Sequence, residues 1–375
     1  CRLFRAARRF RWRQAQTGAV KKTPAVLVCD ARTGSLEIAG LTALDRLVVT
    51  AHRAGCAPIF LVGESPPRLA RAEALGIHLT HVRDVSAFEE IREPMLWIEG
   101  SVLVEARDLE NVVAMNGQLV SAESGLLPVR MEVAELKPII AGAVAMLISD
   151  ATSAVEAERK LWASLTSSAD GLVDRFFNRP LGRPLSKLLV RTPISPNQVS
   201  VISILIGLAS AWFFARGNFL AGAIVFQLCA VVDCVDGDLA RALFKQSRLG
   251  KWLDLGGDQI VHVSVFAAIG LGVARLDPTI PALALGASAA LGVLLCFAVI
   301  VRALRQPSSQ RSPLLNKLLD ATANRDFSVL LLFLAIIGRM DLFLWMAGIG
   351  IHVFWIALLV LLSSRATASM SRAAV

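Results

Sequence analysis

Aspartates are concentrated in one short stretch of an otherwise apolar half of the chain. Residues 192–375 contain nine aspartates and no glutamate. Five of the nine lie close together: Asp233, Asp236, Asp238, Asp254 and Asp258. Hard divalent cations such as Mg²⁺ prefer carboxylate oxygens, and clustered carboxylates can hold paired cations for phosphoryl transfer. The first hypothesis for this chain is therefore a metal-assisted reaction at phosphorus.

The spacing of four of these residues predicts that they meet. Asp233 and Asp236 are three positions apart, and Asp254 and Asp258 are four apart, so each pair shares one face of a helix. Residues 242–250 between the two segments allow the helices to fold back as a hairpin. Four carboxylates at one place would repel one another and take up protons, whereas divalent cations between them make the arrangement favourable.

Small and basic residues accompany the aspartates. Gly237 lets a flat ligand approach the helix backbone, Ala240 keeps the next turn slim, and Arg241 is placed to bind a phosphate. Gly250 relaxes the predicted hairpin. Two plainer interpretations are small-residue packing between helices and ion pairing of the aspartates with the bases of residues 241–248. The ion pairs are disfavoured because these bases lie off the aspartate faces.

Six apolar stretches are expected to carry these residues across a membrane. They lie near residues 197–215, 219–240, 252–274, 279–301, 322–338 and 342–363. A bilayer needs ~20 residues, so the fifth stretch is short, and the last two require a tight hairpin between them. Basic residues concentrate in the loops 241–251 and 302–325, and the positive-inside rule therefore places both termini and the aspartates on the cytoplasmic side of a cell (inner) membrane. Acids inside membrane helices are functional candidates by default.

The composition excludes several classes of protein. The 375 residues are 55% hydrophobic and 18% charged, with a mean hydropathy of +0.58, which fits neither an ordinary soluble domain nor a disordered chain. The cysteines form no CxxC pair, so neither a disulfide framework nor a zinc site is expected. Residues 1–22 hold eight Arg and Lys and no acid, which accounts for most of the net charge of +9. This basic segment is expected to be a solvated tail or to lie against anionic lipid, and nucleic acid is not an expected partner.

The complete pattern resembles a family signature. The residues Asp233-x-x-Asp236-Gly237-x-x-Ala240-Arg241, then Gly250, Asp254 and Asp258 at their spacing, are similar to the full signature of the CDP-alcohol phosphotransferase (phosphatidyltransferase) family. The resemblance covers about residues 165–365. It implies a six-helix membrane domain that transfers a phospho-alcohol group from a CDP-linked donor to an acceptor alcohol and releases CMP.

The resemblance also implies roles for individual residues. Asp233, Asp236, Asp254 and Asp258 would bind two divalent ions, Mg²⁺ or Mn²⁺, and Gly237, Ala240, Arg241 and Gly250 would surround the CDP moiety. Asp258 would also act as the general base on the acceptor hydroxyl. Pro196-Asn197 resembles the family's entry to the first helix, where Asn197 either touches the cytidine or simply starts the helix. The family further implies a homodimer.

The substrates are left open by these residues. CDP-diacylglycerol and CDP-inositol are the candidate donors, and a polar alcohol or an alcohol phosphate is the expected acceptor. The run from Ala169 to Arg179 resembles the inositol-phosphate subgroup. A cation pathway built on the aspartates and a catalytically silent membrane scaffold are the alternative functions, but neither requires the glycines and the arginine at these positions.

The first half of the chain predicts a soluble α/β domain. Ala25–Cys29, Pro58–Val62 and Met95–Ile98 are short apolar runs typical of strands, and Leu41–Gly55 has helical spacing, which together indicate a parallel, Rossmann-like sheet. Residues 40–63 resemble the opening of a sugar-nucleotidyltransferase domain.

The phosphate-binding features of that family are missing. Cys29–Ser35 contains one glycine and no G-x-G-x-R loop, and Glu99-Gly100-Ser101 stands where a metal-binding aspartate is expected. We therefore expect a degenerate domain that docks, regulates or dimerises. An active cytidylyltransferase that supplies its own CDP donor is the alternative.

The expected organisation has five parts. They are a basic segment (1–22), the nucleotidyltransferase-like α/β domain (23–165), a juxtamembrane segment (166–194), the membrane domain (195–366) and a tail (367–375). The juxtamembrane segment carries bases every four residues, at Arg175, Arg179, Arg183, Lys187 and Arg191. With its leucines and phenylalanines this pattern predicts a helix at the membrane surface, with Pro180 and Pro184 breaking its regularity.

Overall fold

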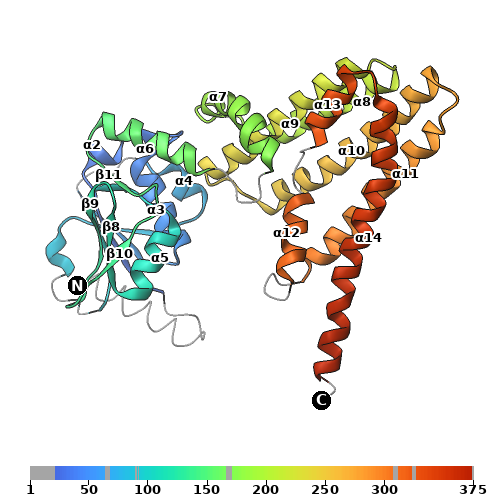
Figure 1. The fold of residues 1–375 in the computed structure, drawn as a ribbon. Helices are drawn as coiled ribbons and strands as arrows, with labels where there is room; N and C mark the ends of the chain where they lie inside the picture. The colour runs from blue at the N-terminus through green and yellow to red at the C-terminus, as the bar shows by residue number, and fades with distance from the viewer. Residues whose placement is uncertain are drawn as a thin grey trace. The chain divides into compact units, whose positions relative to one another are not determined.

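The computed structural model describes residues 22–63, 68–88, 91, 93–165, 171–306, 311–322 and 327–373 (Figure 1). The predicted basic segment, apart from Lys22, and the pair Ala169-Asp170 lie outside these residues. The chain forms two compact units. The first contains the residues up to Leu165 together with Ala242–Phe244, and the second contains Thr166–Arg241 and Lys245–Val375.

The first unit is built on a mixed β-sheet. The strands are β1 (Ala25–Val28), β2 (Glu37–Ile38), β3 (Leu41–Thr42), β4 (Ile59–Val62), β5 (Leu79–Val82), β6 (Leu96–Glu99), β7 (Ser101–Leu103), β8 (Gly117–Ser121), β9 (Gly125–Met131), β10 (Lys137–Ile140) and β11 (Met146–Ile148). The main sheet has the order β10-β8-β9-β6-β1-β4-β5. Strands β6, β1, β4 and β5 run parallel, so the parallel sheet predicted from the first three apolar runs is confirmed.

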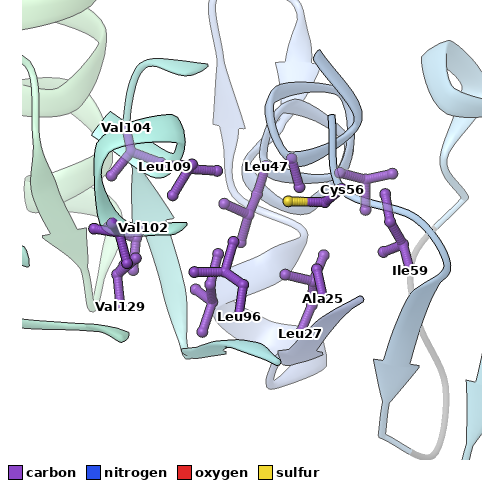
Figure 2. Packing of buried hydrophobic residues seen from close by; sticks show 14 of the residues in the cluster. Ala25, Leu27, Leu47, Cys56, Ile59, Leu96, Val102, Val104, Leu109 and Val129 are labelled. Carbon is purple, nitrogen blue, oxygen red and sulfur yellow. The ribbon is translucent and has the colours of Figure 1, made fainter. Parts of the chain in front are cut away.

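Both faces of the sheet are covered by apolar side chains. The helices of this unit are α2 (Ala31–Gly34), α3 (Ala43–Arg53), α4 (Ala70–Ala74), α5 (Ala106–Met115) and α6 (Ala151–Ser164). Ala25 and Leu27 of β1 pack in one cluster with Leu47 of α3 (Figure 2), whereas Val26 faces the opposite cluster with Trp97. Because side chains alternate along a strand, a continuous apolar run such as β1 is the pattern of a strand buried on both faces.

The turn after β1 is closed by its own side chain. The Asp30 carboxylate accepts hydrogen bonds from the backbone N–H groups of Arg32 at 2.9 Å and Thr33 at 3.3 Å. These bonds favour the ionised form and hold the pKa of Asp30 below its ordinary value. At the end of β6, Glu99 pairs with the Arg130 guanidinium at 3.0 Å. The two acids at this edge of the sheet are therefore engaged with groups of the chain itself.

The second unit begins with the juxtamembrane segment. A π-helical turn, Asp174–Asn178, leads directly into α7 (Arg179–Leu189), so the helix predicted here is present. The segment is irregular as expected, since the π-helical turn gives way to α7 next to Pro180, and Pro184 lies inside α7 without ending it. Pro184 and the preceding Pro180 are both exposed, so the carbonyl that Pro184 leaves without an amide partner faces outward.

Five described helices are long and apolar enough to cross a membrane. They are α8 (Pro196–Ala215), α9 (Phe219–Ala242), α10 (Arg248–Leu276), α11 (Ala282–Leu304) and the part of α14 (Met340–Ala373) that ends at Leu362. The remaining helices are α12 (Pro313–Thr322) and α13 (Phe327–Ile336). These helices and the five spans make this a multi-pass membrane protein.

The predicted count of six spans is not confirmed. Within the described residues, the fifth predicted span, 322–338, corresponds to α13, which has 10 residues. At about 1.5 Å per residue such a helix covers about half of the ~30 Å hydrocarbon core. The tight turn predicted before the last span is present: Gly338 has φ +70° and α14 begins at Met340. The backbone of α14 continues to Ala373, through most of the predicted tail.

Close helix contacts depend on small residues. A Cβ added to Gly207 of α8 would lie 2.6 Å from both methyl groups of Val261, and one added to Gly257 of α10 would lie 2.3 Å from Ile204. Carbon atoms in ordinary contact are separated by roughly 3.5–4.0 Å. The glycines therefore set how closely α8 approaches α10, the helix that carries Asp254 and Asp258.

Candidate active site

Helices α9 and α10 bring three of the predicted metal-binding aspartates together. Asp233 and Asp236 lie in α9 and Asp254 lies in α10. One carboxylate oxygen from each of the three lies within 4.8 Å of the others, and Asp236 is buried whereas Asp254 is exposed. Oxygen donors at such separations, on rigid helices and open on one side, fit a hard divalent cation such as Mg²⁺ or Mn²⁺.

Asp258 is placed differently from the other three. It lies one turn beyond Asp254 in α10, is half-buried, and is not a member of the close triad. The structure thus brings three of the four carboxylates together. The fourth, Asp258, lies one turn from Asp254 along α10. This position is compatible with the base role that the signature implies for Asp258, which remains a prediction.

Two serines of α8 hold the carboxylates of α9. The Ser200 hydroxyl donates to the Asp236 carboxylate, and the Ser203 Oγ lies 3.3 Å from Asp233 Oδ1. Both serines are buried and three positions apart, so they share one face of the helix. Neither serine is among the predicted site residues. The signal for them is a polar i,i+3 pair within an apolar helix.

A cavity of about 530 Å³ opens beside the aspartates. Its walls come from the beginning of α8, the end of α9 and the beginning of α10: Pro196, Asn197, Ser200, Asp236, Gly237, Ala240, Arg241, Lys245, Gln246, Ser247, Arg248, Gly250, Lys251 and Asp254. All five residues predicted to bind the CDP moiety line this cavity. Its walls combine basic side chains with two aspartates, which suits an anionic ligand bound through cations.

Gly237 makes room for the Arg241 guanidinium. A Cβ at Gly237 would lie 3.3 Å from Nη1 and 3.4 Å from Nη2 of Arg241. These contacts are tighter than ordinary ones, so a larger residue would displace the guanidinium by a few tenths of an ångström. The glycine thus acts on the arginine directly, in addition to the room for a flat ligand that the sequence predicts.

Asp238 fixes the same guanidinium from its buried side. It is 1% exposed, and its Oδ1 accepts from Arg241 Nη2 at 2.9 Å and from Arg179 Nη1 at 2.6 Å. Its Oδ2 accepts from the Ser186 hydroxyl at 3.3 Å. In the sequence, Asp238 belongs to the acidic cluster but receives no role of its own. The available signal is Arg241 three positions later on the same helix.

Gly250 lets the first turns of α8 and α10 meet. A Cβ at Gly250 would lie 2.9 Å from Asn197 Oδ1 and 3.1 Å from Ser247 Oγ. The Ser247 hydroxyl caps α10 by accepting from the Gly250 N–H at 2.9 Å. Asn197, for which contact with a ligand and a simple helix start are the alternatives, lies in the first turn of α8 and also on the cavity wall.

Other candidates lie away from this cavity. Arg302 is in the last turn of α11 and Arg305 caps that helix, and neither is among the described residues that line the cavity. His262 packs among the rings of Phe226, Phe266 and Phe327. The contacts described for His262 are thus with aromatic rings.

Comparison with known proteins gives one family match and several relatives. Residues 193–364 match the family CDP-alcohol phosphatidyltransferase. The chain is 37% identical over 106 residues to the bifunctional IPC transferase and DIPP synthase of Thermococcus kodakarensis, which covers 28% of this chain and 24% of that protein. It is 36% identical over 102 residues to the archaetidylinositol phosphate synthase of Pyrococcus horikoshii, which covers 27% of this chain and 54% of that protein.

A solved structure also aligns with part of the chain. It is the phosphatidylinositol phosphate synthase of Mycobacterium tuberculosis in complex with manganese and citrate, with a TM-score of 0.37 and 18% identity over 48% of this chain and 88% of that one. The aligned segments span about a quarter of the bifunctional Thermococcus kodakarensis relative and about half of the Pyrococcus horikoshii one. The matched family segment does not include the residues of the first unit up to Leu165. Together, the signature residues and the match assign residues 193–364 to the CDP-alcohol phosphatidyltransferase family of transferases.

Proposed function

We propose that this protein is a metal-dependent transferase that moves a phospho-alcohol group from a CDP-linked donor to an acceptor hydroxyl and releases CMP. The observation that carries the proposal is the cavity in which two aspartates of the triad, Asp236 and Asp254, share walls with Arg241. An acidic cation site beside a basic wall is what a diphosphate needs, because the diphosphate must be bound and its leaving group stabilised.

Different residues of the cavity would bind the diphosphate, the cytidine and the cations. Arg241, held by Asp238 and packed on Gly237, would bind the donor diphosphate. Asn197, Ala240 and Gly250 would bound the cytidine end. Asp233, Asp236, Asp254 and Asp258 would hold Mg²⁺ or Mn²⁺, two ions per site. When bound, such ions neutralise the diphosphate and make CMP a better leaving group.

Asp258 would remove the proton from the acceptor. The acceptor oxygen attacks the β-phosphorus of the donor, its new P–O bond forms as the P–O bond to CMP breaks, and the hydroxyl proton goes to the Asp258 carboxylate. A carboxylate near its ordinary pKa is a weak base, so alignment of the hydroxyl with the phosphorus contributes as much as basicity.

The acceptor we propose is an inositol phosphate. The relatives support this choice, because archaetidylinositol phosphate synthase and phosphatidylinositol phosphate synthase are among them. Both candidate donors, CDP-diacylglycerol and CDP-inositol, share the CDP moiety that the cavity fits. We further propose that the enzyme is a homodimer whose termini and active site lie on the cytoplasmic side of the cell membrane, and the charged loops 241–251 and 302–325 support this orientation.

The α/β unit is proposed to be an accessory domain. Its closed turn supports this role: the amides of Arg32 and Thr33, where a nucleotidyltransferase would face phosphates, are bound by Asp30. The Glu99–Arg130 ion pair likewise engages the acid at the end of β6, where a cation would otherwise be bound.

The decisive experiment is CMP release by the purified full chain in detergent. CDP-diacylglycerol and CDP-inositol are each offered with inositol phosphate, glycerol phosphate or serine, with Mg²⁺ or with EDTA, beside Asp258→Asn. We expect Mg²⁺-dependent release with inositol phosphate and one donor, lost with EDTA and in the variant. Release with glycerol phosphate or serine alone would refute the proposed acceptor. Absence of release from any pair, in folded protein that also fails to bind either donor, would refute the transferase itself.

A further inference from the structure

A second cavity lies on α7, outside the proposed active site. It has a volume of about 720 Å³ and is lined by Arg175, Phe176, Arg179, Pro180, Arg183, Pro184 and Lys187. Four of these seven side chains are cationic and none is acidic. None of them lines the cavity beside the aspartates, so the donor site does not account for this concentration of positive charge.

The nearby acids are turned away from the cavity. The Asp174 carboxylate accepts from the Asn178 side chain at 2.6 Å, and Asn178 in turn bonds Gln227 of α9. Asp238 binds Arg179 from the buried side. Within the described part of the chain, Arg175, Arg183 and Lys187 have no acidic partner. The buried Nε of Arg183 has no hydrogen-bond partner among the described atoms. A cavity with such cations is suited to an anion with several acceptor oxygens.

Helix α7 is amphipathic, but its polar face is buried and its apolar face is exposed. Its polar side is buried against α9: Ser186 is 0% exposed, and a Cβ on Gly182 would lie 3.0 Å from the Val231 carbonyl oxygen. Apolar residues are exposed on the outer side of α7 and of the π-helical turn before it, with Leu188 66% and Phe176 71% exposed. Apolar side chains beside cations, on a helix next to membrane spans, are typical of a segment lying in the lipid headgroup region.

We propose that the α7 cavity binds the phosphate of an anionic phospholipid, with the exposed apolar side chains against its acyl chains. The cations supply charge and hydrogen-bond donors for the phosphate oxygens. The apolar rim favours a lipid over a free phosphate, because an inorganic anion leaves Phe176 and Leu188 in water. The short link from the end of α7 at Leu189 to the start of α8 at Pro196 keeps the cavity close to the membrane surface.

The test is lipid binding by the full chain, without any CDP donor, so that it does not depend on the proposed reaction. Phosphatidylglycerol and phosphatidylcholine are titrated into protein in a neutral detergent, and the bound fraction is read by native mass spectrometry. We expect phosphatidylglycerol to bind and phosphatidylcholine to bind far more weakly. Arg183→Gln and Lys187→Gln should each weaken phosphatidylglycerol binding by about fivefold, the usual value of one cation at an anionic surface. Arg183→Lys, which keeps the charge, should weaken it less.

Two controls locate the effect. Lys317→Gln removes another exposed lysine, in α12, and Arg248→Gln removes a cation from the cavity beside the aspartates. Neither should change phosphatidylglycerol binding, and thermal unfolding checks that every variant is folded. Equal binding of both lipids, no effect of Arg183→Gln, or an equal effect of Arg248→Gln would overturn the proposal. Displacement of phosphatidylglycerol by inorganic phosphate at matched concentration would assign the cavity to a free phosphate instead.

Discussion

Arg179 of α7 and Arg241 of α9 donate to the same atom, Oδ1 of Asp238, at 2.6 and 2.9 Å. The carboxylate is 1% exposed, the Arg179 side chain 8% and the Arg241 side chain 29%, so a buried acid lies between one buried and one partly exposed base. Arg241 also lines the proposed donor cavity, and Arg179 lines the α7 cavity. Asp238 therefore fixes one wall residue of each.

Asp238→Asn should impair donor binding more than it impairs the chemical step. The amide keeps the shape but loses the charge that orients the Arg241 guanidinium, and a hydrogen bond to a charged group contributes roughly 1.5–3 kcal/mol. We expect KM for the CDP donor to rise by about tenfold or more, with a smaller change in kcat, in steady-state CMP release. An unchanged KM would show that Arg241 is oriented by other groups.

The buried ion pair between Arg179 and Asp238 should be important for stability. Removal of one member of a buried ion pair typically costs about 3–5 kcal/mol, because the remaining charge stays buried without a partner. Asp238→Ala should therefore lower the thermal midpoint clearly. Arg339→Gln is the matched control, since it breaks the Arg339–Asp341 bridge, whose side chains are 52% and 26% exposed, and exposed pairs contribute about 0–1 kcal/mol.

Asp254→Asn should abolish turnover without unfolding the protein. Asp254 is an exposed member of the carboxylate triad, so its charge contributes to cation binding and little to packing. We expect activity to fall by about two to three orders of magnitude or more, as when a single transition-state-stabilising group is removed. Mn²⁺ binding, followed by electron paramagnetic resonance, should weaken as well. Asp277→Asn at the other end of α10 is the control, and substantial residual activity in Asp254→Asn would contradict the cation site.

The aspartate site is predictable from the sequence because local spacing determines it. Residues three or four apart on a helix share a face, so their spacing alone pairs Asp233 with Asp236. The meeting of α9 with α10 also follows, since the short link between them permits only a hairpin. The role of Asp238 does not follow, because one of its partners, Arg179, lies 59 positions away in another helix.

The fifth predicted span and the juxtamembrane helix show that the pattern of apolar residues does not determine where a helix begins or ends. Hydropathy over 322–338 indicates a span, but the helix that the structure describes there, α13, comprises the 10 residues Phe327–Ile336, and no hydropathy value fixes where a helix ends. At Pro184 the sequence predicts only an irregularity, and α7 continues through the proline, whose side chain is exposed. Tertiary packing decides both outcomes.

Burial makes Cys56 a test of the first unit. The thiol is 2% exposed in the core beneath α3, and burial raises its pKa to about 12. A raised folded-state pKa means that the thiol's contribution to stability is complete below the unfolded value of about 8.5 and is lost as the pH rises towards 12. We expect iodoacetamide at about pH 8, close to the ordinary thiol pKa, to leave Cys56 unmodified until denaturant is added, as judged by peptide mass spectrometry. Rapid modification of the native protein would contradict this core.

The first unit should not activate a sugar phosphate. Purified protein given CTP, Mg²⁺ and a sugar phosphate should release no pyrophosphate, because the Asp30 carboxylate occupies the amides of Arg32 and Thr33, from which a triphosphate would be excluded by both space and charge. The same preparation must release CMP from a CDP donor, which shows that it is active.

Asp30→Ala sharpens this test. Removing the carboxylate frees the two amides, so the variant should bind CTP more tightly than the parent protein, in equilibrium dialysis with labelled nucleotide. The Glu99–Arg130 pair is unchanged in the variant, and we therefore expect binding without pyrophosphate release. Robust release by the parent protein would instead identify the α/β unit as an active cytidylyltransferase, and the chain as one that makes its own donor.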